Sequence, residues 1–149
     1  HWWYPSYYPD SFEYFKPVLK SKSFNKSDKQ KIINAYDNSI RYSDYVLGRI
    51  IDLIKDKNSI MIYLSDHGEL LGENNKWIHA QDTEFEKNPA CVIWFSSKFK
   101  EKYPEKVQAA IDNKNKHFRS DFLFHSILDA GCISTPYKVN ALNIFSEKH

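Results

Sequence analysis

The sequence predicts an α/β fold with a mainly parallel sheet, and the order of two patterns carries this prediction. Apolar side chains recur at the helical period over about residues 28–56, which indicates a long amphipathic helix. After a turn at 56–58, residues 59–65 form a nearly continuous apolar run, which is typical of a strand covered on both faces. Helix, turn and covered strand in this order favour a parallel sheet.

The other segments carry shorter signals. Three prolines predict an irregular path over residues 1–24, packed on a surface and with one short helical turn. Residues 66–88 show no clean period and are expected to form a long loop, which in compact domains is usually functional or disordered. We expect a second buried strand over 89–96, helices over 104–115 and 121–129, and a short strand or loop at 139–145.

Two helix ends have recognisable capping residues. Ser27 is the expected N-cap of the long helix, because Gln30 three residues later completes a capping box. Gly131 is the expected C′ residue of the late helix, since glycine is common where a helix ends.

Length and charge limit the class of protein. The chain has 149 residues, enough for one compact domain and too few for two of ordinary size. Lys and Arg total 21 against 19 Asp and Glu, so no basic footprint indicates a nucleic-acid partner. No apolar run approaches the roughly 18 residues that a membrane span needs. Because the single methionine is Met61, we expect the chain to be part of a longer protein.

The cysteines are uninformative about redox compartment. Cys91 lies in an apolar run and is expected to be a buried free thiol. Pairing of Cys91 with Cys132 stays open, because nothing in the sequence requires it.

The residues that point to chemistry directly follow the expected strand at 59–65. Asp66 and His67 would leave the sheet at the carboxyl end of that strand, where open α/β sheets bind their ligands. A carboxylate oxygen and an imidazole nitrogen are both good zinc ligands. Gly68 would let the chain turn sharply. The alternative is an ordinary turn with His67 as a surface residue.

The surrounding residues add a family resemblance. Ser65-Asp66-His67-Gly68-Glu69, followed by Leu71-Gly72-Glu73, resembles the metal-binding signature of sulfatases and phosphoethanolamine transferases in the alkaline phosphatase superfamily. The resemblance implies that Asp66 and His67 are metal ligands, for zinc or alternatively calcium or manganese. It also implies a three-layer α/β/α sandwich of the alkaline-phosphatase type.

Three further segments resemble the phosphoethanolamine transferase branch, namely residues 36–47, 76–79 and 124–133. By this resemblance, His79 faces the phosphate group of the substrate. His1 echoes a family histidine that precedes a Tyr-Pro pair and spaced phenylalanines, although Trp2-Trp3 replaces the usual Gly-Pro and a purification tag would also explain it. Ala80 stands where the family usually has glycine, which leaves the substrate open.

The resemblance implies a domain organisation and a function. Residues 1–149 would be the C-terminal part of one sulfatase-like catalytic domain, and its partner would be the upstream half of that domain. That half would supply the nucleophile, a threonine in the family. The enzyme would transfer phosphoethanolamine from a phospholipid donor to a cell-envelope lipid or glycan acceptor. The parent protein would lie in the inner membrane, with the catalytic domain facing the periplasm. The alternatives are a sulfatase or phosphodiesterase of the same superfamily, or a catalytically silent fragment.

Other polar residues have simpler interpretations. Glu69 and Glu73 could relay protons near a metal, but orienting the loop is the simpler role, and Glu69 could support His67. His125 is expected to be a packing or surface histidine, while His117 and His149 are expected to be solvated.

Overall fold

The computed structural model describes residues 3–23 and 25–147 of the chain. The described residues form two compact units. The first contains the residues up to Leu53 together with Ile62–Val92, and the second contains Ile54–Met61 with the residues from Ile93 onward. All of the residues that the sequence proposes as metal ligands, and His79, lie in the first unit.

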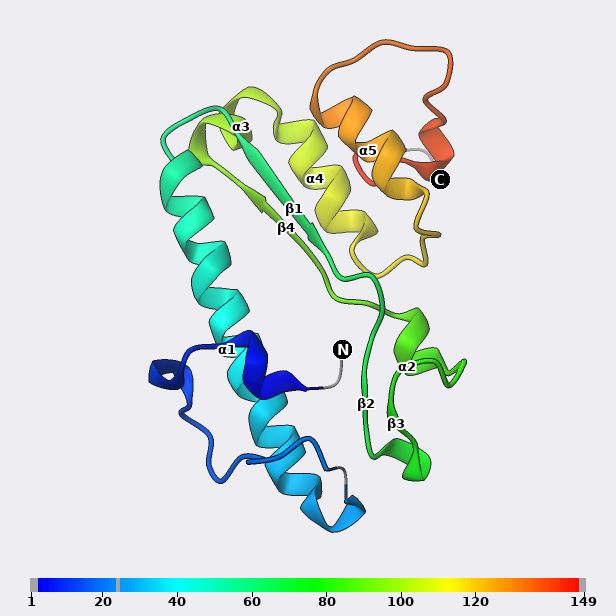
Figure 1. Cartoon of the computed structure of the whole chain (residues 1–149). Coiled ribbons are helices and arrows are strands. Elements are labelled where there is room, and N and C mark those ends of the chain that lie inside the picture. Colours follow the sequence, from blue (N-terminus) through cyan, green and yellow to red (C-terminus); the bar gives the residue numbers. More distant parts are fainter. Residues whose placement is uncertain (1–2, 24, 148–149) are drawn as a thin grey trace. The chain divides into compact units, whose positions relative to one another are not determined.

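The long helix predicted from the apolar period is confirmed as α1, Lys29–Ile54 (Figure 1). A 3₁₀ turn at Lys26–Asp28 precedes it, and the side chain of Asn25 accepts a hydrogen bond from the Ser27 N–H at 3.0 Å. The N-cap prediction for Ser27 is therefore wrong. Asn25 caps instead, because the 3₁₀ turn extends the helical path upstream of α1.

One face of α1 is covered along its first half only. Ile32 is 3% exposed and Ala35 is fully buried, whereas Ile50 is 41% and Leu53 is 73% exposed. Ile32 and Ile50 lie five helical turns apart at 3.6 residues per turn, as do Ala35 and Leu53. The two residues of each pair therefore lie at the same angle around the helix axis. The apolar face of α1 thus continues beyond the part of the helix that the N-terminal segment covers.

The core of the first unit joins the N-terminal segment to α1. Tyr4, Val18 and Leu19 are buried against Ile32 and Ala35. As predicted, the segment is irregular, but it contains two 3₁₀ turns, at Tyr4–Tyr7 and Asp10–Phe12, where one short helical turn was expected.

Asn38 fastens this segment to the helix. Its fully buried amide oxygen accepts from the N–H groups of Tyr14 and Phe15, both at 2.9 Å, and its nitrogen donates to the Phe15 carbonyl at 2.9 Å.

The two predicted strands are confirmed as β1, Ile60–Leu64, and β4, Cys91–Phe95, which are neighbours in one sheet (Figure 1). The Ser65 N–H donates to the Ala90 carbonyl, and the Ser96 N–H donates to the Ser59 carbonyl. Each bond joins the end of one strand to the start of the other, so these two strands run antiparallel. The α/β class stands, but the parallel pairing does not occur between them, because residues 65–90 return to the same end of the sheet without a crossover.

The expectation of one long loop over 66–88 is wrong. The strands β2, Leu70–Leu71, and β3, Trp77–Ile78, form an antiparallel hairpin in which Leu70 pairs with Ile78. A short helix follows, α2, Glu84–Lys87, with a capping box at Thr83. Strands of two residues are too short to show an alternating pattern, so no period marks them in the sequence.

The second unit is mainly helical. It contains α3, Ser97–Lys102, which the sequence analysis missed, and the predicted helices α4, Pro104–Asn113, and α5, Phe122–Ala130. Residues 140–142 of the expected strand or loop form a 3₁₀ turn. Gly131 has φ −80° and the left-handed residue is Cys132, with φ 55°, so the C′ prediction is displaced by one position.

The cysteine expectations are settled in part. Cys91 and Cys132 are both free, but both are exposed, so the expectation that Cys91 is buried is wrong.

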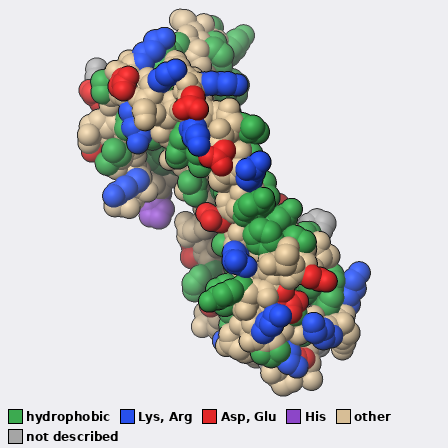
Figure 2. All heavy atoms as spheres, turned by 90° about the vertical axis from the view of Figure 1, so that its left-hand side faces the viewer, with side chains coloured by type: hydrophobic (Ala, Val, Ile, Leu, Met, Phe, Trp, Pro, Cys, Tyr) green, Lys and Arg blue, Asp and Glu red, His purple; other side chains and the backbone are tan. Residues whose placement is uncertain are grey.

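The face in Figure 2 carries interspersed basic and acidic side chains, in keeping with the balanced composition.

A half-buried ion cluster links three segments of the second unit. The Asp129 carboxylate lies 3.4 Å from Lys106 Nζ and 2.5 Å from Lys138 Nζ. Burial by itself would raise the pKa of Asp129, but the hydrogen bond from Lys138 and the charge of Lys106 outweigh it, and the pKa is lowered.

Loss of the Asn38 amide is expected to destabilise the first unit. Asn38→Ala leaves the Tyr14 and Phe15 N–H groups without their acceptor, which costs about 2 kcal/mol. Asn58→Ala at an exposed position is the matched control. Urea unfolding measures both variants, and equal midpoints for the two would contradict the role given to Asn38.

The ion cluster predicts a pH-dependent contribution to stability. Because the folded-state pKa of Asp129 is lowered, the contribution is full above the unfolded pKa, about 3.9, and is lost as pH falls through the folded pKa. Asp129→Asn should therefore be less stable than the wild type at pH 6, with the difference shrinking toward pH 2. Urea midpoints across this range test it, and a difference that does not change with pH would oppose it.

Candidate metal centre and phosphoryl site

Asp66 and His67 stand where the chain turns away from β1. The Ser65 hydroxyl donates to the His67 carbonyl at 2.9 Å, and the His67 N–H donates to Asp66 Oδ1 at 3.1 Å. These bonds close a tight local turn. As a result, the two side chains converge, with Asp66 Oδ2 3.7 Å from His67 Nε2.

The hydrogen bond at Nδ1 of His67 determines the tautomer of the ring, and therefore whether Nε2 has a free lone pair. Nδ1 lies 2.7 Å from the Gly68 carbonyl, which can only accept, so Nδ1 carries the proton. The lone pair of Nε2 then faces the side of Asp66. Two ligand atoms on one tetrahedral zinc are separated by about 3.4 Å, close to the spacing observed.

Gly68 permits a close approach. A Cβ at this position would lie 1.9 Å from the Phe85 carbonyl oxygen, and the Gly68 N–H donates to the Glu86 carbonyl at 2.9 Å. The glycine is required because the backbone of α2 packs directly on it, which differs from the turn that the sequence suggested.

The β2–β3 hairpin brings Glu69 and His79 together. Since Leu70 pairs with Ile78, the next residues outward along the ladder are Glu69 and His79. Glu69 Oε1 lies 3.4 Å from His79 Nδ1, and the rings of His67 and His79 have centroids 4.7 Å apart. His67, Glu69 and His79 each offer one ligand atom, and these atoms lie within 4.8 Å of one another.

Glu69 is the least exposed of these side chains, at 11%, whereas Asp66 is 86% exposed. Two tyrosines, Tyr4 of the N-terminal segment and Tyr36 of α1, interact electrostatically with Glu69. Burial, followed by the charge of Glu69, raises the pKa of both Tyr4 and Tyr36. These two phenols therefore stay protonated beside Glu69.

The remaining sequence candidates that the structure describes have partners of their own or are exposed. His125 is buried in the second unit, where its Nδ1 accepts from the Val139 N–H at 3.1 Å, so the packing interpretation is confirmed. Glu73 accepts from the Leu71 N–H at 2.6 Å, which fits the role of orienting the loop. His117 is exposed, as expected. His1 and His149 lie outside the described residues.

Sequence reasoning named three of the four clustered residues as site residues, Asp66, His67 and His79. For Glu69 it offered proton relay near a metal, orientation of the loop or support of His67, and did not name it as a site residue. The missing signal was the hairpin register, which places Glu69 against His79.

Comparison with known proteins places these observations in a family. The sulfatase family model matches residues 1–132. Phosphoethanolamine transferase EptA of Salmonella typhimurium is 32% identical over 146 residues, which cover 90% of this chain and 26% of that protein. EptA of Helicobacter pylori is 34% identical over 133 residues, covering 84% of this chain and 24% of that protein.

The chain is also similar in fold to solved structures of phosphoethanolamine transferases. The C-terminal periplasmic domain of phosphoethanolamine transferase EptC from Campylobacter jejuni has a TM-score of 0.82 and 28% identity, covering 97% of this chain and 47% of that one. The soluble domain of lipooligosaccharide phosphoethanolamine transferase A from Neisseria meningitidis has a TM-score of 0.83 and 25% identity, covering 95% and 45%. These likenesses confirm the expected fold class.

The chain spans about a quarter of the length of these curated relatives and under half of the solved domains. Among the described residues, no helix has the length and apolar character needed to cross a membrane. Because the family model covers most of the chain, including the whole Asp66–His79 segment, the chain belongs to the sulfatase family, as a phosphoethanolamine-transferase-like member.

Proposed function

We propose that this chain carries part of the metal centre of an enzyme that transfers phosphoethanolamine from a phospholipid donor to a cell-envelope lipid or glycan acceptor. The observation that supports this most is the convergence of Asp66 Oδ2 and His67 Nε2, 3.7 Å apart, with the His67 tautomer set by the Gly68 carbonyl. The names of the relatives supply the transferred group.

Zinc is the metal that these side chains fit best. Calcium takes oxygen ligands, so the imidazole of His67 argues against it, and manganese remains a weaker alternative. A bound zinc ion would polarise a phosphoryl oxygen and lower the proton affinity of an attacking hydroxyl. Asp66 and His67 would hold that ion, and the Gly68 carbonyl would keep the His67 ring oriented toward it.

His79 is placed to act on the transferred group. Its side chain is 31% exposed, and Nδ1 faces Glu69 Oε1 at 3.4 Å. A carboxylate at Nδ1 favours the tautomer that carries its proton there and holds the ring in place. His79 would then stabilise charge on the phosphoryl group, as would His1, which the family resemblance adds.

The rest of the machinery would come from an upstream half of the same domain. The nucleophile is proposed to lie there, together with further metal ligands, because tight zinc sites use three or four protein ligands. The EptC relative is described as a periplasmic domain and the full-length N. meningitidis enzyme as an integral membrane protein. These descriptions support a parent protein in the inner membrane, with this domain facing the periplasm. The transferase names favour transfer over sulfate-ester or phosphodiester hydrolysis.

The first test is zinc binding by the purified chain. We expect weak binding, since few ligands are present, and a loss of about tenfold or more for Asp66→Asn and for His67→Gln. His117→Gln, at an exposed histidine, is the matched control. Titration against a competing chelator measures the wild type, these three variants and Glu69→Gln. Unchanged zinc affinity in both ligand variants would refute the Asp66–His67 centre. A larger loss of affinity in Glu69→Gln would indicate that the ion binds between His67, Glu69 and His79 instead.

The second test is activity. With zinc added, the isolated chain should not turn over a chromogenic phosphodiester, because the proposed nucleophile lies in the upstream half. Adding the upstream half as a separate polypeptide should produce turnover, and adding it to Asp66→Asn should not. Release of the chromophore by the isolated chain, followed by absorbance, would show that the nucleophile lies within these residues.

A further inference from the structure

The segment that carries His79 follows an unusual backbone path. Ile78 has φ 60°, Ala80 has φ 65° and Asp82 has φ 51°. This left-handed region suits glycine, and a β-branched residue such as Ile78 adopts it only where the surroundings enforce it. His79 stands between two such residues, at the start of the connection from β3 to α2 (Figure 1). The direction of its side chain therefore depends on the contacts that hold this backbone in place.

The carboxylate of Glu86 holds the downstream side of this segment. Its Oε1 accepts from the Gln81 N–H at 3.0 Å, and its Oε2 accepts from the N–H and the hydroxyl of Thr83, each at 3.0 Å. The hydrogen bond from Gln81, together with those from Thr83, lowers the pKa of Glu86. The group is therefore ionised near neutral pH, and hydrogen bonds to an ionised acceptor are the stronger kind. Gln81 follows Ala80 directly, so this carboxylate restrains the left-handed backbone beside His79.

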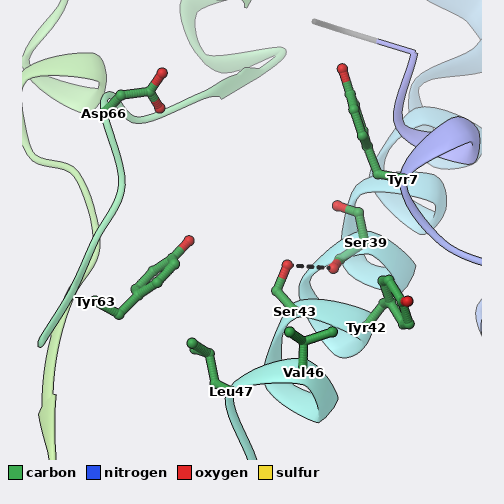
Figure 3. A pocket seen from close by; sticks show the side chains of 8 residues that line it. All are labelled: Tyr7, Ser39, Tyr42, Ser43, Val46, Leu47, Tyr63 and Asp66. Atoms are coloured by element: carbon green, nitrogen blue, oxygen red, sulfur yellow. Dashed lines mark hydrogen bonds between the residues drawn. The ribbon is translucent and has the colours of Figure 1, made fainter. Parts of the chain in front are cut away.

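The main chain of the same residue holds the turn after β1. The Glu86 carbonyl accepts from the Gly68 N–H at 2.9 Å, and the Gly68 carbonyl in turn lies 2.7 Å from His67 Nδ1. Asp66, on the same turn, lines a pocket of about 530 Å³ beside the end of β1 (Figure 3). One residue of α2 thus contacts both the turn with the proposed metal ligands and the segment that follows β3.

Two other contacts near His79 do not explain its backbone path. Glu69 Oε1 lies 3.4 Å from Nδ1 of the His79 ring, so it acts on the side chain and not on the main chain. Lys87 Nζ lies 2.9 Å from Asp82, but the two side chains are 53% and 88% exposed, and exposed pairs of this kind add little stability. Helix α2 has four residues, too few to be stable alone, so it relies on contacts such as those of Glu86.

We propose that Glu86 is a positioning residue that sets the separation between His79 and the turn carrying Asp66 and His67. The inference rests on the proposed function, in which the metal ligands and His79 act on one phosphoryl group. The spacing, 4.7 Å between the ring centroids of His67 and His79, is maintained by main-chain contacts from outside the site. Glu86 acts through these main-chain groups and not on the reacting atoms.

Nuclear Overhauser cross-peaks between the His67 and His79 rings, recorded on the zinc-free chain, measure this spacing. Glu86→Ala removes the carboxylate and should abolish the cross-peaks, because the backbone beside His79 can then leave the left-handed region. Glu84→Ala, on the same helix, loses an exposed ion pair at 4.0 Å and should keep them. Unchanged cross-peaks in Glu86→Ala would overturn the proposal.

Rescue at residue 80 distinguishes positioning from a general loss of stability. Glycine adopts the left-handed conformation without the steric cost of alanine, so Ala80→Gly should restore part of the cross-peaks in the Glu86→Ala background. Absence of any recovery would contradict the positioning role. Unchanged amide resonances of α1 identify the variants that fold. If Glu86→Ala does not fold, Glu86→Gln replaces it: one acceptor oxygen remains, so the cross-peaks should weaken, and full cross-peaks would overturn the proposal.

Activity gives a second readout. In the chain combined with its upstream half, Glu86→Ala should lower kcat for the chromogenic phosphodiester about tenfold and leave KM little changed. The reason is that His79 is proposed to act on charge that develops in the transition state. A raised KM with unchanged kcat would contradict a role in positioning His79.

Zinc titration separates this inference from the metal centre. Glu86→Ala should leave zinc affinity nearly unchanged, because Asp66, His67 and the main-chain bond to Gly68 remain. Asp66→Asn should do the reverse, lowering zinc affinity about tenfold and keeping the ring cross-peaks. If the wild type binds no zinc but Glu86→Ala loses the cross-peaks, the positioning role stands and the metal proposal fails. If zinc binds as proposed while Glu86→Ala keeps the cross-peaks, the metal proposal stands and the positioning role fails.

Discussion

The candidate site depends on the contact between Gly68 and the backbone of Phe85 and Glu86. With no Cβ at residue 68, the α2 segment lies against the turn that follows β1, and the Gly68 N–H is satisfied by the Glu86 carbonyl. The same glycine offers its carbonyl to His67 Nδ1. One residue thus connects the position of the loop to the orientation of a proposed ligand, so its small size has a direct chemical consequence.

The two carboxylates near this contact, Glu69 and Asp66, differ in how far they are exposed to solvent. Glu69 is the shielded carboxylate, held between a histidine and two tyrosines that keep their protons, while Asp66 is open to solvent. A buried carboxylate among fixed partners positions its neighbours, and an exposed one beside an imidazole can take part in binding an ion. The hairpin register produces the first arrangement and the turn after β1 produces the second.

The sequence predicted the features that depend on periodicity or on a specific motif. Helix α1 follows a sustained apolar period, and Asp66 and His67 stand in a motif whose spacing is characteristic. It failed where the deciding interactions are non-local. The hairpin that joins Glu69 to His79 has strands of two residues, and the β1–β4 direction depends on the path of the loop between them. Asn25 replaced Ser27 as cap because both residues cap well and only the backbone path distinguishes them.

The uneven cover of α1 affects how the polypeptide behaves in solution. Its first turns are enclosed by the N-terminal segment, but Val46, Ile50 and Leu53 present apolar surface along the second half of the helix. Exposed apolar surface of this kind promotes association. When produced without a covering partner, the chain would therefore tend to aggregate or to require a mild detergent, for reasons unrelated to its folding or its chemistry.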